Sequence, residues 1–329
     1  MKKTLALILA LTMALSLAAC GTAGTASSPA ASAEPGSSAS PTASYVVGFS
    51  NVDDIYSYCA KFRDYLVADC KELGIDLIVT NAGGDANVMN GQIEDMISQN
   101  AKIVSTIACN PDGNTPALDS ARTAKLPYVA FLNSIKGGDD YDGYIYIGSQ
   151  NYDAGTMQGK YLAETLPKNA KVIYLTGSLS NQENLDRKNG MMDALKERTD
   201  ITFIAEYDVD SKKDRAMSTT EDCLQAFDSF DAIVCQNDDA ALGAVEALKA
   251  ANRLDGVITV GIDGSDAALA SIQAGELTMS VLQDAKAQAK AGADVFAQIR
   301  DGADPATIKD VFVPFQVITK DNVVDFIAK

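Results

Sequence analysis

Short apolar runs alternate with longer segments of helical spacing along most of this chain, and this alternation constrains the fold more than any other feature. Strands are predicted over 45–49, 75–79, 102–108, 127–132, 144–147, 171–175, 201–207, 232–235, 257–262, 277–282 and 311–319. Helices are predicted over 56–73, 87–100, 115–124, 153–166, 181–198, 219–228, 266–274 and 285–300, and in the segment that begins at Asp238. This pattern predicts an α/β protein in which helices cover both faces of parallel sheets.

Polar residues follow most of the predicted strands, and the stretch from Ala232 to Ala244 is the clearest case. Its apolar run ends at Gln236 and Asn237, and Asp238 and Asp239 fall in the first turn of the helix that follows. Carboxylates there can cap backbone N–H groups, which is a purely structural use. In open α/β sheets, however, ligands bind outside the carboxyl ends of the strands. The stretch alone leaves both interpretations open.

The N-terminal segment has the features of an export signal. Lys2 and Lys3 precede an apolar run over 4–17 that is short for a membrane span. The following Leu17-Ala18-Ala19-Cys20-Gly21 resembles the lipobox of bacterial lipoproteins, which implies cleavage before Cys20 and a lipid on its thiol. An ordinary signal with a chance cysteine is the alternative. We expect residues 1–20 to be a signal peptide and 21–44, rich in Gly, Ala, Ser, Thr and Pro, to be a flexible tether.

Composition removes several classes of function. The chain has a formal charge of −17 and no basic cluster, which argues against nucleic acid as a partner. It contains no His, so imidazole catalysis and the commonest transition-metal ligand are absent. We expect no catalytic residues, no metal site and no cofactor. The five cysteines besides Cys20 have no metal-site spacing, and we interpret them as small buried residues.

The globular part, from about Tyr45 to Lys329, resembles the ribose- and galactose-type sugar-binding proteins of ABC transporters. The residues that carry this resemblance are Lys71-Glu72-Leu73-Gly74, Arg187-x-x-Gly190, Cys235 to Ala244, Val260-Gly261-Ile262-Asp263-Gly264 and Pro314 to Asn322. The resemblance implies the periplasmic binding protein type 1 fold, with two doubly wound parallel-sheet domains joined by a three-segment hinge. It places the N-terminal lobe in 45–149 plus 284–313 and the C-terminal lobe in 150–283 plus 314–329.

The resemblance also implies a ligand site between the lobes. Four polar side chains match the family's contacts in the C-terminal lobe: Arg187, Asn237, Asp263 and Gln283. In the N-terminal lobe the candidates are Tyr56 and Tyr58, for stacking on a sugar ring, with Asp54 and Asn133 for hydrogen bonds; Asn51 and Asp53 are further candidates. Ribose-type members carry Asp-Arg after the fourth strand, whereas this chain has Leu132-Asn133, so the identity of the sugar stays open.

The predicted function is that of an extracytoplasmic lipoprotein. We expect a monomer, anchored to the bacterial cell membrane through Cys20, that captures a sugar or polyol and delivers it to an ABC transporter permease. One alternative is a lipoprotein that presents a sugar or furanosyl signal to a membrane receptor. Another is a carbohydrate-active enzyme, for which the chain offers carboxylates but no nucleophile elbow or phosphate loop. A transcription regulator of the same fold would need a DNA-binding segment where residues 1–44 supply a signal and tether.

Overall fold

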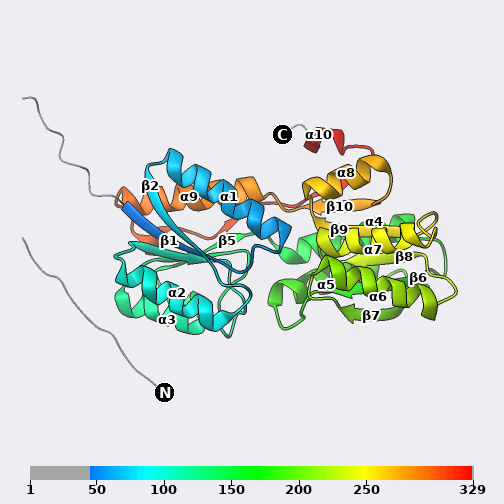
Figure 1. Cartoon of the computed structure of the whole chain (residues 1–329), viewed down its shortest axis with the longest axis horizontal. Coiled ribbons are helices and arrows are strands. Elements are labelled where there is room, and N and C mark those ends of the chain that lie inside the picture. Colours follow the sequence, from blue (N-terminus) through cyan, green and yellow to red (C-terminus); the bar gives the residue numbers. More distant parts are fainter. Residues whose placement is uncertain (1–44, 328–329) are drawn as a thin grey trace, which may run out of the picture. The chain divides into compact units, whose positions relative to one another are not determined.

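The computed structural model describes residues 45–327, which form two α/β sheets with helices on both faces (Figure 1). The predicted fold class is therefore confirmed. The predicted signal peptide, the predicted lipid site at Cys20 and the predicted tether lie outside the described residues. No helix in the described part of the chain combines the length and the apolar character that a membrane span requires.

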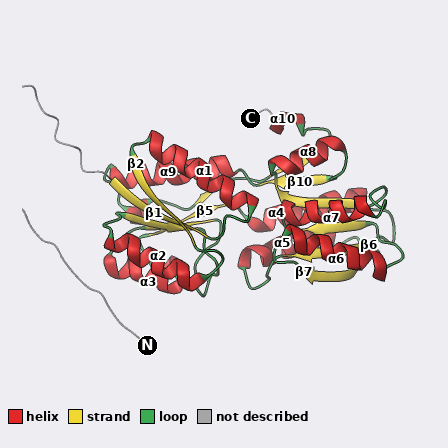
Figure 2. Ribbon diagram, in the orientation of Figure 1, coloured by secondary structure: helices red, strands yellow, loops and turns green. Residues whose placement is uncertain are grey.

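The first sheet is entirely parallel, and its central strands β3 and β4 are fully buried (Figure 2). Their order across the sheet is β11 (Val311–Phe312), β5 (Tyr144–Gly148), β4 (Tyr128–Phe131), β3 (Ile103–Thr106), β1 (Tyr45–Asn51) and β2 (Ile75–Asn81). One face is covered by α1 (Ser57–Glu72) and α9 (Ala285–Arg300), the other by α2 (Ala86–Ser98) and α3 (Thr115–Ala124). Short 3-10 turns lie at Gly138–Asp140 and Pro305–Thr307. We call this sheet and its helices the first lobe.

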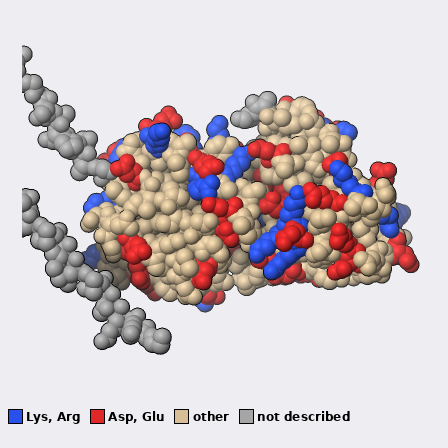
Figure 3. Space-filling model, in the orientation of Figure 1, with Lys and Arg blue, Asp and Glu red and all other residues tan. Residues whose placement is uncertain are grey.

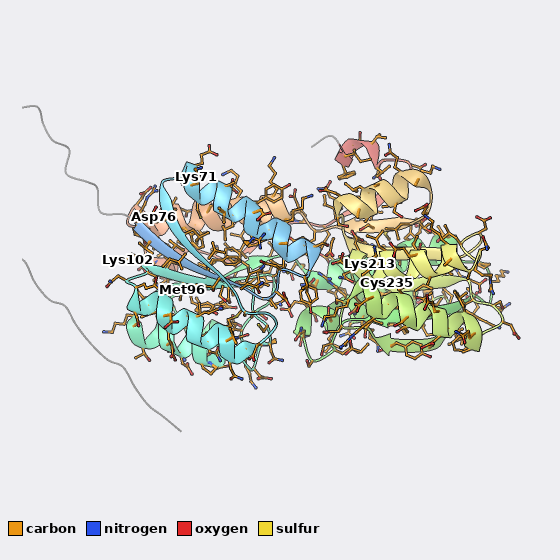
Figure 4. The ribbon with its side chains drawn as sticks, in the orientation of Figure 1. Lys71, Asp76, Met96, Lys102, Lys213 and Cys235 are labelled. Atoms are coloured by element: carbon orange, nitrogen blue, oxygen red, sulfur yellow. The ribbon has the colours of Figure 1, made fainter. Side chains whose placement is uncertain are left out.

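Aromatic packing holds α1 and α9 on the first sheet. Phe49, Phe62, Phe131 and Phe296 are fully buried, and their ring centroids lie 4.9 to 6.0 Å apart in tilted and edge-to-face pairs. On the opposite face, α2 approaches β1 closely enough that a Cβ at Gly48 would lie 2.5 Å from Sδ of Met96, a residue labelled in Figure 4.

The second sheet repeats this architecture with one antiparallel strand. Its order is β12 (Gln316–Thr319), β10 (Met279–Leu282), β9 (Ile258–Asp263), β8 (Ala232–Cys235), β6 (Lys171–Thr176) and β7 (Thr202–Asp208). Its helices are α4 (Asn151–Thr165), α5 (Gln182–Leu195), α6 (Lys213–Ala226), α7 (Asp238–Ala250), α8 (Asp266–Ala274) and α10 (Val324–Ile327). The buried cores on its two faces are separate: α4 and α5 pack on one face, and α6, α7 and α8 on the other. We call this the second lobe.

The chain passes between the two sheets three times. The crossings lie between Gly148 and Asn151, between Leu282 and Ala285, and between Phe312 and Gln316. A hydrogen bond of 2.7 Å from the Ser149 hydroxyl to the Val313 carbonyl joins the first crossing to the third. These are the three hinge segments that the resemblance implies.

Two sequence-based predictions of elements were wrong in their extent. The single closing strand over 311–319 is two strands, β11 and β12, that belong to different sheets. Pro314 stands between them and has no N–H to donate to a ladder, so the chain leaves one sheet there and enters the other antiparallel to β10. The helix predicted over 219–228 is α6, which begins at Lys213; its charged first turn faces solvent while Ala216 packs into the core.

The described cysteines are free thiols, as predicted. Four are buried and Cys109 is half-buried. Cys235, labelled in Figure 4, ends β8, and burial raises the pKa of its thiol well above the usual range. Among the described residues, no group of three or more His, Cys, Asp or Glu side chains is arranged to hold a metal ion.

Candidate functional site

A cavity of about 410 Å³ lies between the two lobes, at the carboxyl ends of strands from both sheets. Such positions are the usual ligand sites of open α/β sheets, and the volume suits a small ligand. The wall includes seven of the eight predicted contact residues: Tyr56, Tyr58, Asn133, Arg187, Asn237, Asp263 and Gln283.

The eighth predicted contact, Asp54, is not part of the cavity wall. Its carboxylate accepts a hydrogen bond of 2.6 Å from Nδ2 of Asn51 and forms an ion pair with Arg63 on α1. These two partners hold the side chain against the first lobe. Asp53 lines the cavity instead, and Asn51 is fully buried.

Arg187 on α5 is held by three neutral acceptors. Its Nε donates to Oδ1 of Asn151, Nη1 to the Gln236 carbonyl and Nη2 to Oε1 of Gln283, each at 2.8 Å. A guanidinium has five N–H groups, so one N–H on each Nη remains for a ligand. Because the fork is rigid, these two donors can reach two adjacent oxygens of one molecule.

Close packing of α4 against α5 puts Arg187 in reach of Asn151. A Cβ at Gly155 on α4 would lie 1.8 Å from the Arg187 carbonyl oxygen, and a Cβ at Gly190 on α5 would lie 2.0 Å from the Tyr152 carbonyl oxygen. Real Cβ atoms do not approach so closely, so these two positions require glycine.

Asp263 ends β9 in a strained backbone conformation, with φ of 132°. Its side chain is 7% exposed and forms no hydrogen bond with another side chain of the described residues. Burial and the neighbouring Asp238 raise the pKa of its carboxyl well above the usual range, and the charge of Arg187 lowers it in part. Backbone strain and a buried carboxyl with a raised pKa at the same residue are typical of functional sites.

The remaining predicted contacts of the second lobe also have structural partners. Oδ1 of Asn237 accepts from the Ala240 N–H at 3.1 Å and caps α7, while Nδ2 donates to the Ser211 carbonyl at 3.0 Å. One N–H of its amide is left for the cavity. Gln283 is 4% exposed, and its backbone N–H donates to the Asp263 carbonyl at 3.0 Å.

The two aspartates that follow Asn237 have different roles, and neither caps its own helix. Asp238 is fully buried, accepting from the Ser265 N–H at 2.8 Å and from the Ser280 hydroxyl at 2.6 Å. Burial raises the pKa of its carboxyl to about 7. Asp239 reaches the first lobe, where it accepts from the N–H and the hydroxyl of Ser57 at 3.1 and 2.9 Å.

In the first lobe, two tyrosines and an asparagine contribute to the wall. The Tyr58 hydroxyl donates to Oε1 of Gln288 at 2.7 Å, so its buried ring is fixed in place. Tyr56 is half-buried, and burial raises the pKa of its hydroxyl to about 12. Nδ2 of Asn133 donates to the Ala108 carbonyl at 2.8 Å, which leaves Oδ1 available as an acceptor.

Among the wall residues that were not predicted as contacts, two are notable for their hydrogen bonds. Glu183 lies one turn before Arg187 on α5, and its Oε1 accepts from the Ser134 N–H of the first lobe at 2.9 Å. The i, i+4 spacing from Arg187 is a signal that could have identified it. Asn151 follows the first crossing, and nothing in its local sequence distinguishes it from an ordinary helix start.

Comparisons with known proteins agree with this geometry. A family model described as "Periplasmic binding protein domain" matches residues 47–304. A protein of Rhizobium meliloti named for rhizopine binding is 31% identical over 263 residues, which are 78% of this chain and 84% of the relative. The xylitol-binding protein of Mycolicibacterium smegmatis is 28% identical over 273 residues, covering 83% and 76% of the two chains.

Among solved structures, an ABC transporter solute-binding protein of Bacillus halodurans with bound myo-inositol superposes with a TM-score of 0.82. It is 24% identical, and the match covers 88% of this chain and 99% of the other, which supports the fold. The Caulobacter myo-inositol binding protein is 25% identical with a TM-score of 0.80, over 86% and 97% of the two chains. This chain belongs to the sugar-binding periplasmic binding proteins of type 1.

Proposed function

We propose that this protein captures a sugar or sugar-like polyol between its lobes and delivers it to the permease of an ABC transporter. The observation that carries the proposal is that Arg187 and Asp263 line the same cavity wall. Arg187 has two N–H donors left for a ligand, and Asp263 has a buried carboxylate. Adjacent hydroxyls of a polyol can accept hydrogen bonds from Arg187 and donate hydrogen bonds to Asp263. Relatives named for xylitol, ribose and xylose binding support this ligand class.

Binding and closure follow from the same contacts. A ligand hydroxyl that loses water without a partner costs about 1–3 kcal/mol, so a closed cavity must offer fixed donors and acceptors. Asn133 and the two tyrosines come from the first lobe, and Arg187 and Asp263 from the second. Since a ligand contacts both sets together only when the lobes are closed, it shifts the population toward the closed form. No covalent step is involved, and the family's members are binding proteins.

The proposed setting is the outer face of the bacterial cell membrane. We infer that lipid on Cys20 anchors a monomer there and that residues 21–44 form the tether. We also infer lobe boundaries at 149/150, 283/284 and 313/314, because strands on either side of these points belong to different sheets.

A ligand screen tests the central proposal. The purified protein is heated with pentoses, hexoses, polyols, nucleosides, amino acids and peptides, and hits are titrated by calorimetry. A ligand at 100 times its Kd stabilises the native state by about 2.7 kcal/mol, which a thermal shift detects. We expect at least one polyhydroxylated compound to raise the melting temperature. We also expect that compound to be recovered chemically unchanged after incubation with the protein. A shift with amino acids or peptides alone would refute the proposal, and a chemically altered sugar would indicate an enzyme.

Delivery has a separate test in the producing bacterium. Deleting the gene is expected to abolish uptake of the radiolabelled ligand at low concentration. Normal uptake after deletion would leave the binding proposal intact and overturn the transport step.

A further inference from the structure

Glu183 presents a buried carboxylate oxygen that has no partner in the described part of the chain. The residue is 9% exposed, and its Oε1 accepts from the N–H and the hydroxyl of Ser134 at 2.9 and 3.4 Å. Its Oε2 is buried and accepts no hydrogen bond from the residues the structure describes. An unpaired buried charged acceptor is costly, so this oxygen needs a donor from elsewhere.

Carboxylates outnumber cations on the wall of the cavity. Five acidic side chains face two basic ones, and the first lobe contributes no Lys or Arg to the described wall. Of the two cations, Lys212 forms an ion pair of 2.6 Å with Asp210, and Arg187 is held by neutral acceptors. Glu183 and Asp263 therefore share one guanidinium between them.

A second cavity, of about 550 Å³, adjoins the first and is also acidic. The two cavities share Asn151, Ser180 and Glu183. Four further carboxylates line the second cavity against one cation, Lys136, whose ammonium is paired with Asp112 at 2.7 Å. Glu183 thus stands at the boundary of two cavities that both favour positive charge.

This local excess of carboxylates over cations differs from the distribution of charges on the outer surface. On the face shown in Figure 3, Lys and Arg side chains are interspersed with Asp and Glu over both lobes. Inside the cavity, the buried Glu183 and Asp263 both lie near Arg187, and the lower dielectric there strengthens their attraction for a further cation.

We propose that the ligand is a polyol that carries a protonated amine, and that its ammonium group binds to Glu183. This inference rests on the proposed function and narrows its ligand class. An ammonium has three donors, and Oε2 of Glu183 accepts one of them. Oδ1 of Asn133, on the facing wall of the same cavity, is oriented as a second acceptor because Nδ2 donates to Ala108. The hydroxyls of the same ligand then bind to Arg187 and Asp263.

Burial supports this assignment independently of the charge balance. Desolvation raises the pKa of the Glu183 carboxyl above its usual range, and the hydrogen bonds from Ser134 and the charge of Arg187 offset this only in part. A bound ammonium would supply the missing charge and stabilise the ionised form.

Matched ligand pairs test the inference. The protein is titrated by calorimetry with D-glucosamine and D-glucose, D-galactosamine and D-galactose, and scyllo-inosamine and scyllo-inositol. We expect at least one amine to bind ten-fold or more tightly than its neutral partner. In Glu183→Gln, which keeps an acceptor for Ser134, the preference for that amine is expected to disappear. Asp193→Asn, an equal change of charge on the exposed side of α5, is the control and should keep the preference.

The possible titration results separate the amine inference, the assignment of the amine to Glu183 and the proposed function. Neutral partners that bind as tightly as the amines, or more tightly, overturn the amine inference and leave the proposed function standing. An amine preference that survives Glu183→Gln, in a variant whose circular dichroism is unchanged, overturns the assignment to Glu183. If no sugar, polyol or amine binds, the proposed function fails and the inference fails with it.

Discussion

Asp263 is the residue at which stability and ligand binding should separate most clearly. Its backbone is strained, at φ of 132°, and its carboxylate is buried without a side-chain partner among the described residues. We predict that Asp263→Gly and Asp263→Asn both stabilise the ligand-free protein while they abolish tight binding. The glycine variant relieves the strain and removes the charge, whereas the asparagine variant removes only the charge.

The geometry at Asp263 sets the size of the stability gain and of the loss of ligand affinity. Backbone strain of this kind costs about 1–3 kcal/mol, and the extra chain entropy of glycine offsets about 0.5–1 kcal/mol of the relief. On the binding side, two hydrogen bonds from ligand hydroxyls to a charged carboxylate contribute about 1.5–3 kcal/mol each. Their loss raises Kd by roughly 10²- to 10⁴-fold.

The stabilising effect should depend on pH in a defined direction. Because burial and Asp238 raise the pKa of the Asp263 carboxyl in the folded state, the ionised form destabilises the native protein. This penalty is complete above the folded pKa and disappears as the pH falls toward the unfolded pKa of about 3.9. The stability gain of Asp263→Asn should therefore be largest at neutral and alkaline pH and should vanish near pH 4.

Urea denaturation with and without ligand, between pH 4 and pH 8, measures both effects on the same samples. Asp255→Asn, an exposed change in the loop before β9, is the control and should stay within about 0.5 kcal/mol of the parent protein. A ligand-free Asp263 variant that is less stable than the parent at neutral pH would refute the argument about strain and burial. An unchanged Kd would refute the role in binding.

Three other perturbations test separate parts of the structure. Gly155→Ala should destabilise the protein by about 1–3 kcal/mol in urea denaturation because its Cβ would collide with the Arg187 carbonyl, whereas Gly91→Ala, with nothing within 4 Å, should be neutral or stabilising. Asp239→Asn weakens a contact between the lobes, so small-angle scattering of the liganded protein should show a larger radius of gyration; an unchanged radius would contradict this. Cys20→Ser should move the protein from the membrane fraction to the soluble fraction, and retention on the membrane would argue against a lipid anchor.

The elements that the sequence predicted best are those with local signals at both ends. Helix α8 begins at the Ser265 cap and ends at Gly275, whose φ of 79° suits a helix terminus, and its predicted bounds were correct. Helix α9 has a similar start, because the Asp284 side chain accepts from the Ala287 N–H at 2.9 Å. The closing strand was wrong because the apolar pattern continues across Pro314, while sheet membership depends on contacts that the local pattern does not contain.

Seven residues of the cavity wall were predictable from the sequence, but their hydrogen-bond partners were not. Strand-end polar residues and the family resemblance together placed seven side chains on one cavity wall. In the loop after β1 we predicted Asp54 as the contact, with Asp53 as a further candidate, but the ion pair of Asp54 with Arg63 on α1 holds Asp54 away from the cavity wall. Such a choice depends on three-dimensional packing. The same is true of Asp238, which looked like a helix cap and in fact joins two other segments.

The partners of Arg187 connect the proposed ligand site to the hinge. Asn151 directly follows the first crossing and Gln283 lies within the second, and each accepts from one nitrogen of the guanidinium. Their positions are fixed by the same hydrogen bonds that leave two Arg187 N–H groups for a ligand. A ligand that draws the guanidinium toward itself therefore acts on two hinge segments at once.

The first lobe has a matching connection that ends at the third crossing. The Tyr58 hydroxyl donates to Gln288, the Gln288 amide donates to the Ser149 hydroxyl at 2.7 Å, and that hydroxyl donates to the Val313 carbonyl. The first two of these hydrogen bonds are buried, so losing either of them on movement would leave a polar atom unpaired. A ligand that stacks on Tyr58 and bonds to Arg187, as we propose, would therefore engage groups that are bonded to all three crossings. Because both connections converge on the cavity, we expect the geometry of the hinge and the occupancy of the site to be energetically coupled.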